Sequence, residues 1–526
     1  HMTALIAPRL GIADDGVGQD GNAVEIAGGS VLRVGPVEEL RRPGLSEERY
    51  PGGVIVPGIV DAHFHPVAYA SLLNGLSLKT AADFADLQRR IQNRAAGLDQ
   101  GRPLIGVRLD DETLAERRLP TRHDLDAWVS DRPVVLHRYC GHIAVANTAA
   151  LKAGGIDAST VDPEGGSLDR DEEGPTGVVR ETAIELVAMP LAGSNRVEQT
   201  QLVDAMTALA GLGITSIGAI VGIGDGPWAE LGNEVEIVAE AARDLPIKLH
   251  CFVIANTIDD LHEAAGMLGA AGARVSFAGV KRFGDGSLGG HTAAMCLPFT
   301  DRPETSGLLR LDPEADGALA RAAIDLGGRV AVHAIGDCAV GASLDLCESL
   351  IARGAEPSRL RIEHVSVITE SDIDRFSRLG VTAVVQPAFI GSETEWLAAR
   401  VGPDRIGRTY AFRSLLDAGV ALAGSSDCPV EPPDPWAGMA LARDRAGLVP
   451  EQSLTGTEAL GMFTAGSASA IGLAPPLSTG SAADLVVIDR DPTSVTPDEV
   501  RQTQVIATWV DGEPVEIDPG RPHWND

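Results

Sequence analysis

Short apolar runs rich in Val and Ile alternate with Ala- and Leu-rich amphipathic stretches along most of this 526-residue chain. Seven such runs follow residue 203, at 214–220, 247–254, 275–283, 329–333, 360–364, 381–386 and 420–424, and an eighth precedes them at 53–60. Parallel strands need helical crossovers between them, so this alternation is typical of βα units. Eight such units predict an α/β fold of the (β/α)8, or TIM-barrel, type.

Residues that favour helix ends lie between these runs. Thr369 with Asp372 matches a capping box, and Gly380 is placed to end the same segment. The sequence therefore predicts a helix between Thr369 and Gly380.

Two parts of the chain fall outside the barrel pattern. The segment 67–200 is too long for one crossover and contains strand-like runs at 104–109 and 133–139. Both ends carry short alternating strands, at 4–10, 22–34, 484–488, 505–510 and 514–517. We therefore divide the chain into a small β-sandwich domain (1–54 and 475–526) and a catalytic barrel (55–474) that contains an insertion subdomain (67–200).

Charge and composition narrow the set of partners. The chain has 43 Lys and Arg against 74 Asp and Glu, a formal net charge of −31, which repels nucleic acid and anionic lipid. We expect a small-molecule substrate, no nucleic acid and no membrane, with a homodimer as a candidate assembly.

The chain shows neither a membrane-length apolar stretch nor the pattern of a signal peptide near its start. The six cysteines are scattered, so we expect reduced thiols in a cytoplasmic protein.

Ionisable residues end several predicted strands, where a barrel of this type places its active site. These residues are His63, His65, Lys281, His333, His364 and Asp427. His63 and His65 are two apart on an extended chain, so both imidazoles point to one face at a spacing that one metal ion can bridge. The pair alone is weak evidence, because two hydrogen-bonded loop histidines also explain it. Four desolvated imidazoles at strand ends are better explained by shared metal ligation.

Lys281 and Asp427 each have two interpretations. Lys281 lies in an apolar strand, where an unpaired ammonium is costly. It either forms a salt bridge to a carboxylate such as Asp285, or its lowered pKa lets the amine take up CO2 as a carbamate that bridges two metal ions. Asp427 is either a helix N-cap or a site residue, and the prolines that follow it disfavour an immediate helix.

The segments around these residues resemble the amidohydrolase superfamily, and within it the amidohydrolase-3, or YtcJ-like, family. The resemblance covers nearly the whole chain. It rests on GIVDAHFHP (58–66), KRFGDGSLGGHTA (281–293), VHAIGDCAV (332–340), RIEHVSV (361–367), GSSDCPVEPPDPWAGM (424–439) and GSAADLVVIDRDP (480–492). Within the insertion, PTRHDLDAW (120–128), GHIAVANTAAL (141–151) and GPTGVVRETA (174–183) fit the same family.

The resemblance implies a metal centre and a reaction class. His63 and His65 are then ligands of one divalent ion, His333 and His364 of a second, Lys281 the bridge, and Asp427 a ligand and proton shuttle. Zn is the expected metal, with Fe, Mn and Co as alternatives. The implied reaction is hydrolysis of a non-peptide C–N bond, in an N-acyl or N-formyl amine, an amide or a cyclic amide, by a metal-activated hydroxide. An isomerase or lyase using the same ions, and a scaffold without catalysis, stay open as alternatives.

Four further residues are candidates for binding the substrate. Arg108 and His142 belong to the insertion, and each is alternatively a local hydrogen-bonding residue of that subdomain. Trp436 either lines the pocket or packs against the barrel. His291 stands where relatives often have Arg, and Cys338 where they often have a basic residue, and both departures bear on substrate preference.

Overall fold

The barrel predicted from the sequence is present. The computed structural model describes residues 2–7, 9–10, 21–163, 165–191, 193–224, 226 and 231–517. Its central sheet has eight strands that pair in parallel, in the order β20-β19-β18-β17-β16-β15-β14-β7. These are β7 (Ile59–Phe64), β14 (Ile214–Gly222), β15 (Lys248–Ile254), β16 (Val275–Phe283), β17 (Arg329–Ala334), β18 (Leu360–His364), β19 (Thr382–Val385) and β20 (Leu422–Gly424).

The segment after β20 joins the two ends of this sheet. The backbone N–H of Asp427 donates to the carbonyl of His63 at 2.9 Å, and that of His65 donates to the carbonyl of Cys428 at 2.8 Å. The last strand is therefore tied to the first at their carboxyl ends, which is where the ionisable residues lie.

The extent predicted for the first strand, 53–60, is wrong. It divides at Gly58 into β6 (Val54–Pro57), which belongs to a terminal sheet, and β7, which belongs to the barrel. A Cβ at Gly58 would lie 2.2 Å from the hydroxyl of Thr215. The chain therefore passes from one layer to the other at a residue without a side chain.

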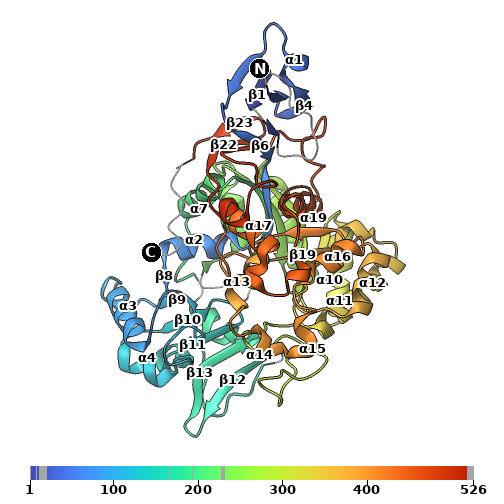
Figure 1. The fold of residues 1–526 in the computed structure, drawn as a ribbon. Coiled ribbons are helices and arrows are strands. Elements are labelled where there is room, and N and C mark those ends of the chain that lie inside the picture. The colour runs from blue at the N-terminus through green and yellow to red at the C-terminus, as the bar shows by residue number, and fades with distance from the viewer. Residues whose placement is uncertain are drawn as a thin grey trace.

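Helices cover the outside of the barrel (Figure 1). They include α7 (Gln199–Gly211), α8 (Glu234–Ala241), α9 (Ile258–Ala271), α10 (Ala315–Asp325), α11 (Asp337–Ala352), α12 (Glu370–Leu379) and α17 (Pro435–Asp444). The capping prediction for α12 is confirmed, because the Thr369 hydroxyl accepts from the Asp372 N–H at 3.2 Å and Gly380 ends the helix with a φ of +71°. The apolar faces of these helices and the outward side chains of the strands form the largest core cluster.

The insertion builds its own six-stranded sheet beside the mouth of the barrel. Its order is β12-β13-β11-β10-β9-β8, and the predicted runs 104–109 and 133–139 become β9 and β10. The strands are β8 (Leu76–Ser77), β9 (Leu104–Leu109), β10 (Val134–Arg138), β11 (Ile143–Ala146), β12 (Gly166–Asp171) and β13 (Gly174–Glu181). Its outer helices are α3 (Phe84–Ala96), α4 (Arg122–Trp128) and α5 (Thr148–Ala153), and α2 (Pro66–Asn74) links β7 to it.

The two ends of the chain pair into two small sheets at the opposite pole (Figure 1). One has the order β4-β3-β1-β5 and the other β2-β6-β21-β22-β23. Their strands are β1 (Met2–Ala7), β2 (Arg9–Leu10), β3 (Asn22–Ala27), β4 (Ser30–Pro36), β5 (Ser46–Arg49), β21 (Leu485–Ile488), β22 (Val505–Val510) and β23 (Glu513–Val515). Residue 8 of the predicted run 4–10 lies outside the described residues. Leu5, Val24, Ile55, Leu485 and Trp509 share one apolar cluster between the two sheets.

The prediction that all six cysteines are reduced is wrong for two of them. Cys296 and Cys338 form a disulfide, whereas Cys140, Cys251, Cys347 and Cys428 are free thiols. The bond joins the loop after β16 to the first turn of α11. Neighbouring barrel loops bring these residues, 42 apart in sequence, to a Cα–Cα distance of 5.0 Å, which spacing along the chain does not reveal.

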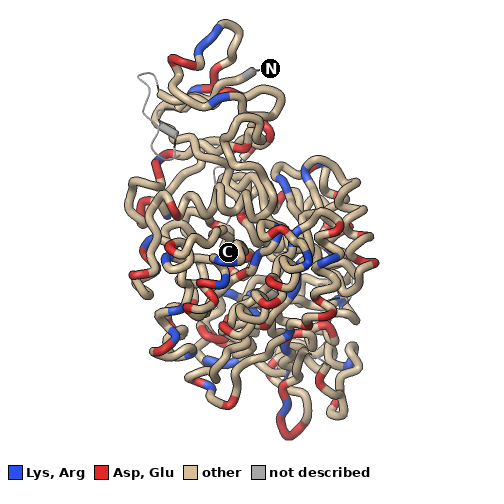
Figure 2. The backbone as a smooth tube through the Cα atoms, turned by 90° about the vertical axis from the view of Figure 1, so that its right-hand side faces the viewer, with Lys and Arg blue, Asp and Glu red and all other residues tan. Residues whose placement is uncertain are grey.

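The excess of acidic residues is spread along the chain. Figure 2 shows Asp and Glu positions on the terminal sheets, the barrel and the insertion, interspersed with Lys and Arg. Within the described part of the chain, no helix combines the length and the apolar character needed to cross a bilayer.

Candidate metal centre

The four histidines and Asp427 converge at the carboxyl ends of the barrel strands. His63 lies near the end of β7 and His65 just after it, His333 lies on β17, and His364 ends β18. The ring centroids of His333 and His364 are 4.4 Å apart, those of His63 and His364 5.1 Å, and those of His63 and His65 5.5 Å. The structure therefore brings together residues that are up to 364 positions apart, from His63 to Asp427, in one cluster that is buried except at His65.

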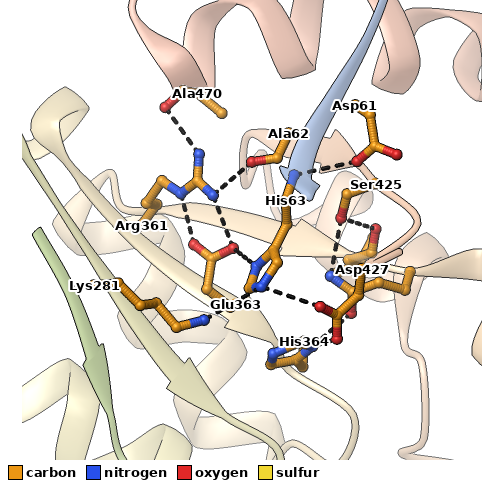
Figure 3. A network of polar contacts seen from close by, with 12 residues as sticks. Asp61, Ala62, His63, Lys281, Arg361, Glu363, His364, Ser425, Asp427 and Ala470 are labelled. Atoms are coloured by element: carbon orange, nitrogen blue, oxygen red, sulfur yellow. Dashed lines mark hydrogen bonds and ion pairs between the residues drawn. The ribbon is translucent and has the colours of Figure 1, made fainter. Parts of the chain in front are cut away.

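Asp427 lies beside His63 and His364 (Figure 3). Its Oδ1 is 3.1 Å from Nε2 of His65 and 3.2 Å from Nε2 of His63, and its Oδ2 is 3.9 Å from Nδ1 of His364. Burial acts to raise the pKa of the Asp427 carboxyl, but the histidines outweigh it and hold the pKa well below its usual range. Asp427 and His364 also have φ values of +57° and +73°, an unfavourable conformation for residues with a Cβ that is concentrated at functional sites.

Lys281 points into the same cluster from β16. It is 1% exposed, and its Nζ lies 3.4 Å from Nε2 of His63. Burial lowers the pKa of Lys281 to about 8, although Glu363 and Asp427 act in the opposite direction. The expected alternative partner, Asp285, instead accepts hydrogen bonds from the backbone N–H groups of Ala294, Ile335 and Gly336 at 2.8–3.0 Å.

Sequence reasoning missed Glu363, which holds the ring of His63. Oε2 of Glu363 lies 2.5 Å from Nδ1 of His63, and Arg361 donates to both carboxylate oxygens at 2.6 and 2.8 Å. Arg361 also donates to the carbonyls of Ala62 and Ala470 (Figure 3). Burial would raise the pKa of Glu363, but Arg361 and His63 hold it far below its usual range. Two charged residues inside the apolar strand RIEH were the signal that could have found this pair.

Partners also fix the tautomers of His63, His333 and His364. The carboxylate of Glu363 holds the proton of His63 on Nδ1, and the Oε1 of Gln386, 2.8 Å away, does the same for His364. Nε2 of His333 donates to the carbonyl of Gly286 at 2.7 Å. The lone pairs then lie on Nε2 of His63 and His364 and on Nδ1 of His333, which is how metal-binding imidazoles are oriented.

This donor set fits a divalent transition metal. His63, His65 and Asp427 each offer a ligand atom, and these atoms lie within 4.8 Å of one another. Imidazoles with fixed tautomers and an ionised carboxylate are the donors that Zn and related ions prefer.

The structure brings His142 and Arg108 towards this centre. The ring of His142 lies 5.1 Å from that of His333. Arg108 is buried on β9, where burial lowers the pKa of its guanidinium and the carboxylate of Glu431 partly offsets the effect. Glu431 follows Asp427 by four residues, so both candidates from the insertion lie beside loops of the barrel mouth.

His291 and Trp436 are not part of this cluster. Nε2 of His291 lies 3.2 Å from Oδ1 of Asp301, and the residue lines a cavity of about 590 Å³ whose lining includes none of the six strand-end residues. Trp436 is 1% exposed and donates to the carbonyl of Leu212 at 3.1 Å. Leu212 precedes β14, at the end of the barrel opposite to the histidines, so the structure supports the packing interpretation of Trp436.

Known proteins match this chain along nearly its whole length. The sequence profile described as "Amidohydrolase family" matches residues 51–516. YtcJ of Bacillus subtilis (strain 168), named as an amidohydrolase, is 30% identical over 515 residues, which cover 93% of this chain and 95% of YtcJ. N-substituted formamide deformylase of Arthrobacter pascens is 29% identical, with 93% of this chain and 94% of that protein covered. A solved structure of an uncharacterized metal-dependent hydrolase from Pyrococcus furiosus is 30% identical, with a TM-score of 0.72 and coverage of 94% of this chain and 100% of that one.

Proposed function

The chain belongs to the amidohydrolase family and is a metal-dependent hydrolase, and on that premise we propose that it cleaves a non-peptide C–N bond in an N-formyl or N-acyl amine, an amide or a cyclic amide. The observation that carries this proposal is the convergence of four histidines, Lys281 and Asp427 at one end of the barrel, with three imidazole tautomers fixed by their partners. The relative from Arthrobacter pascens is named for N-substituted formamides, which makes formamides the first substrates to test.

Two divalent ions would be held by this donor set, with His63 and His65 binding one and His333 and His364 the other. Asp427 reaches both pairs, since its two oxygens face different histidines. Zn suits an imidazole-rich site. When bound, such ions lower the pKa of water towards neutrality and polarise a carbonyl group.

Lys281 completes the donor set as a carbamate in this proposal. The neutral amine adds CO2 and releases one proton, and the product is an anion with two oxygens in place of an ammonium. The pKa of about 8 and the position of Nζ beside Nε2 of His63 support this addition. Divalent ions held by the neighbouring histidines would favour an anion at this position over an ammonium.

Asp427 moves the proton that hydrolysis requires. Its carboxyl is ionised at neutral pH, because its pKa lies well below the usual range. It can therefore accept a proton from the attacking water and deliver it to the leaving nitrogen, which cannot depart from an amide as an anion. Glu363 keeps the ring of His63 in place during these steps, and Arg361 keeps Glu363 ionised.

Metal content and product analysis test the proposal. Protein purified after growth with Zn is expected to contain one to two equivalents per chain and to hydrolyse members of a panel of N-substituted formamides, N-acyl amines and lactams. Hydrolysis in H2¹⁸O places one ¹⁸O atom in the carboxylate product. An isomerase or lyase does not hydrolyse the C–N bond, so it forms no ¹⁸O-labelled carboxylate. Less than a tenth of an equivalent of metal, or metal-loaded protein that is inactive across the panel, would overturn the proposal.

A further inference from the structure

An imidazole from outside the barrel reaches the proposed metal centre. His142 lies in the insertion, immediately before β11, yet its ring contacts the ring of His333 nearly edge-on at 5.1 Å. Its side chain is 14% exposed, so it is enclosed between the insertion and the barrel. The barrel strands and the segments after β7 and β20 already supply the six residues proposed to bind metal.

Glu181 fixes the orientation of the His142 ring. Nδ1 of His142 lies 2.9 Å from Oε2 of Glu181, and the backbone N–H of Glu181 donates to the carbonyl of His142 at 2.9 Å. Glu181 is 4% exposed, ends β13, and has a φ of +52°. A non-glycine residue in this conformation at the centre of a polar network indicates a constraint imposed by its partners.

Arg310 connects this pair to the barrel. Its NH1 donates to the same Oε2 of Glu181 at 2.8 Å, and its backbone N–H donates to the carbonyl of Gly284 at 2.7 Å. The N–H of Gly284 in turn donates to the carbonyl of His333 at 2.7 Å. A chain of hydrogen bonds thus runs from His142 through Glu181, Arg310 and Gly284 to His333. The two bonds made by the Glu181 carboxylate involve an ionised group and are strong.

We propose that His142 is a substrate-contacting residue supplied by the insertion. Its Nε2, the ring nitrogen that Glu181 does not hold, hydrogen-bonds the amide group of the substrate at the metal centre, and Glu181 and Arg310 are positioning residues that act through it. This inference rests on the proposed function. It gives a role to the sheet beside the mouth of the barrel, because that sheet then supplies the recognition of the scissile group.

Variants of the three residues test the proposal in the full-length, Zn-loaded protein. We expect His142→Ala to lower kcat/KM on an N-substituted formamide by about 10- to 100-fold, the range for a lost hydrogen bond in an enclosed site. His142→Gln, which keeps a polar end, should recover part of the loss. In a double-mutant cycle, Glu181→Gln should cost about tenfold in the wild-type background and less than twofold in His142→Ala, because it acts through the missing ring.

A binding readout makes the test independent of turnover. Acetohydroxamate carries the N–H and carbonyl of an amide and binds divalent metals, and its Kd should rise about tenfold in His142→Ala. Metal content and the melting temperature should stay at wild-type values. His262→Ala is the matched control, because His262 is an exposed histidine on α9.

The outcomes separate this inference from the proposed function. Metal-loaded wild-type protein that is inactive on every amide would overturn both. An active wild type whose His142→Ala variant keeps more than a third of kcat/KM and an unchanged Kd would overturn the inference alone. Loss of metal together with activity in both His142 variants would also overturn it, since His142 would then support the centre rather than contact the substrate.

Discussion

Glu363→Gln isolates the contribution of one buried carboxylate to the metal centre. Glu363 is fully buried and accepts three hydrogen bonds, two from Arg361 and one from Nδ1 of His63. Glutamine has nearly the same volume, but its amide NH2 must face either Arg361 or His63, and both are donors there. The substitution therefore leaves one donor facing another and a buried guanidinium without its counter-ion.

The size of the effect follows from these contacts. Breaking a buried ion pair by removing one partner costs about 3–5 kcal/mol, and the remaining glutamine oxygen recovers about one hydrogen bond, worth roughly 1 kcal/mol. We therefore expect a loss of about 2–4 kcal/mol in the free energy of unfolding. Metal affinity should fall by about 10- to 100-fold, the usual cost of removing the partner of a metal-binding histidine.

The assay measures metal affinity by competition with a chelator, and stability by thermal unfolding at a fixed heating rate. Glu393→Gln is the matched control, because Glu393 is also buried but its pKa is raised to about 8 by burial and it accepts from the Tyr410 hydroxyl. It is already protonated at pH 7, so glutamine replaces a neutral group there. The double variant Arg361→Met/Glu363→Leu should regain stability without regaining metal affinity.

The reasoning is refuted if Glu363→Gln binds metal within twofold of wild type. It is also refuted if Glu393→Gln weakens metal binding as strongly, since the effect would then come from any buried Glu→Gln change. Recovery of metal affinity in the apolar double variant would show that Glu363 serves stability alone.

Three further predictions test other groups. Lys281→Ala should lose metal or activity, and about 0.1 M acetate or propionate should restore part of it by filling the place of the carbamate; unmodified lysine density in a metal-loaded crystal would refute the carbamate. Asp427→Asn should lower kcat by about 10²–10⁴ while the fold and most metal remain, and more than a third of wild-type kcat with both metals present would show that another group carries the proton. Glu393 has a raised pKa, so its contribution to stability is present below about pH 4.5 and is lost as the pH rises through about 8. Glu393→Gln should therefore gain melting temperature relative to wild type between pH 5 and pH 9, and a constant difference across that range would contradict the assignment.

The architecture of the barrel could be predicted because it depends on local patterns. The apolar period of each strand and the capping residues of α12 are encoded within a few neighbouring positions, and the structure confirms the barrel and this helix. The positions of His333 and His364 at strand ends were also predictable, since each of them ends an apolar run. The break at Gly58 was not predicted, because the close approach of Thr215 that excludes a side chain there involves a residue far along the chain.

The candidate site could be predicted only as a set of residues. Sequence reasoning placed His63, His65, Lys281, His333, His364 and Asp427 at strand ends, because parallel strands end on one face of a barrel. It missed Glu363 and Gln386, whose effect depends on which imidazole nitrogen they reach. A hydrogen bond between β18 and β7 joins residues 300 positions apart, and no periodicity records it.

The sequence by itself determined the order of the strands, the acidic character of the surface and the chemical types gathered at the barrel mouth, since each is a property of neighbouring residues or of their sum. Only the tertiary structure decided the tautomers of the histidines, the pairing of Cys296 with Cys338, and the approach of His142 to His333. These features depend on loops and on an inserted sheet whose contacts are made across space. Their energies come from the burial of polar groups and from the geometry of hydrogen bonds, and both exist only once the chain has folded.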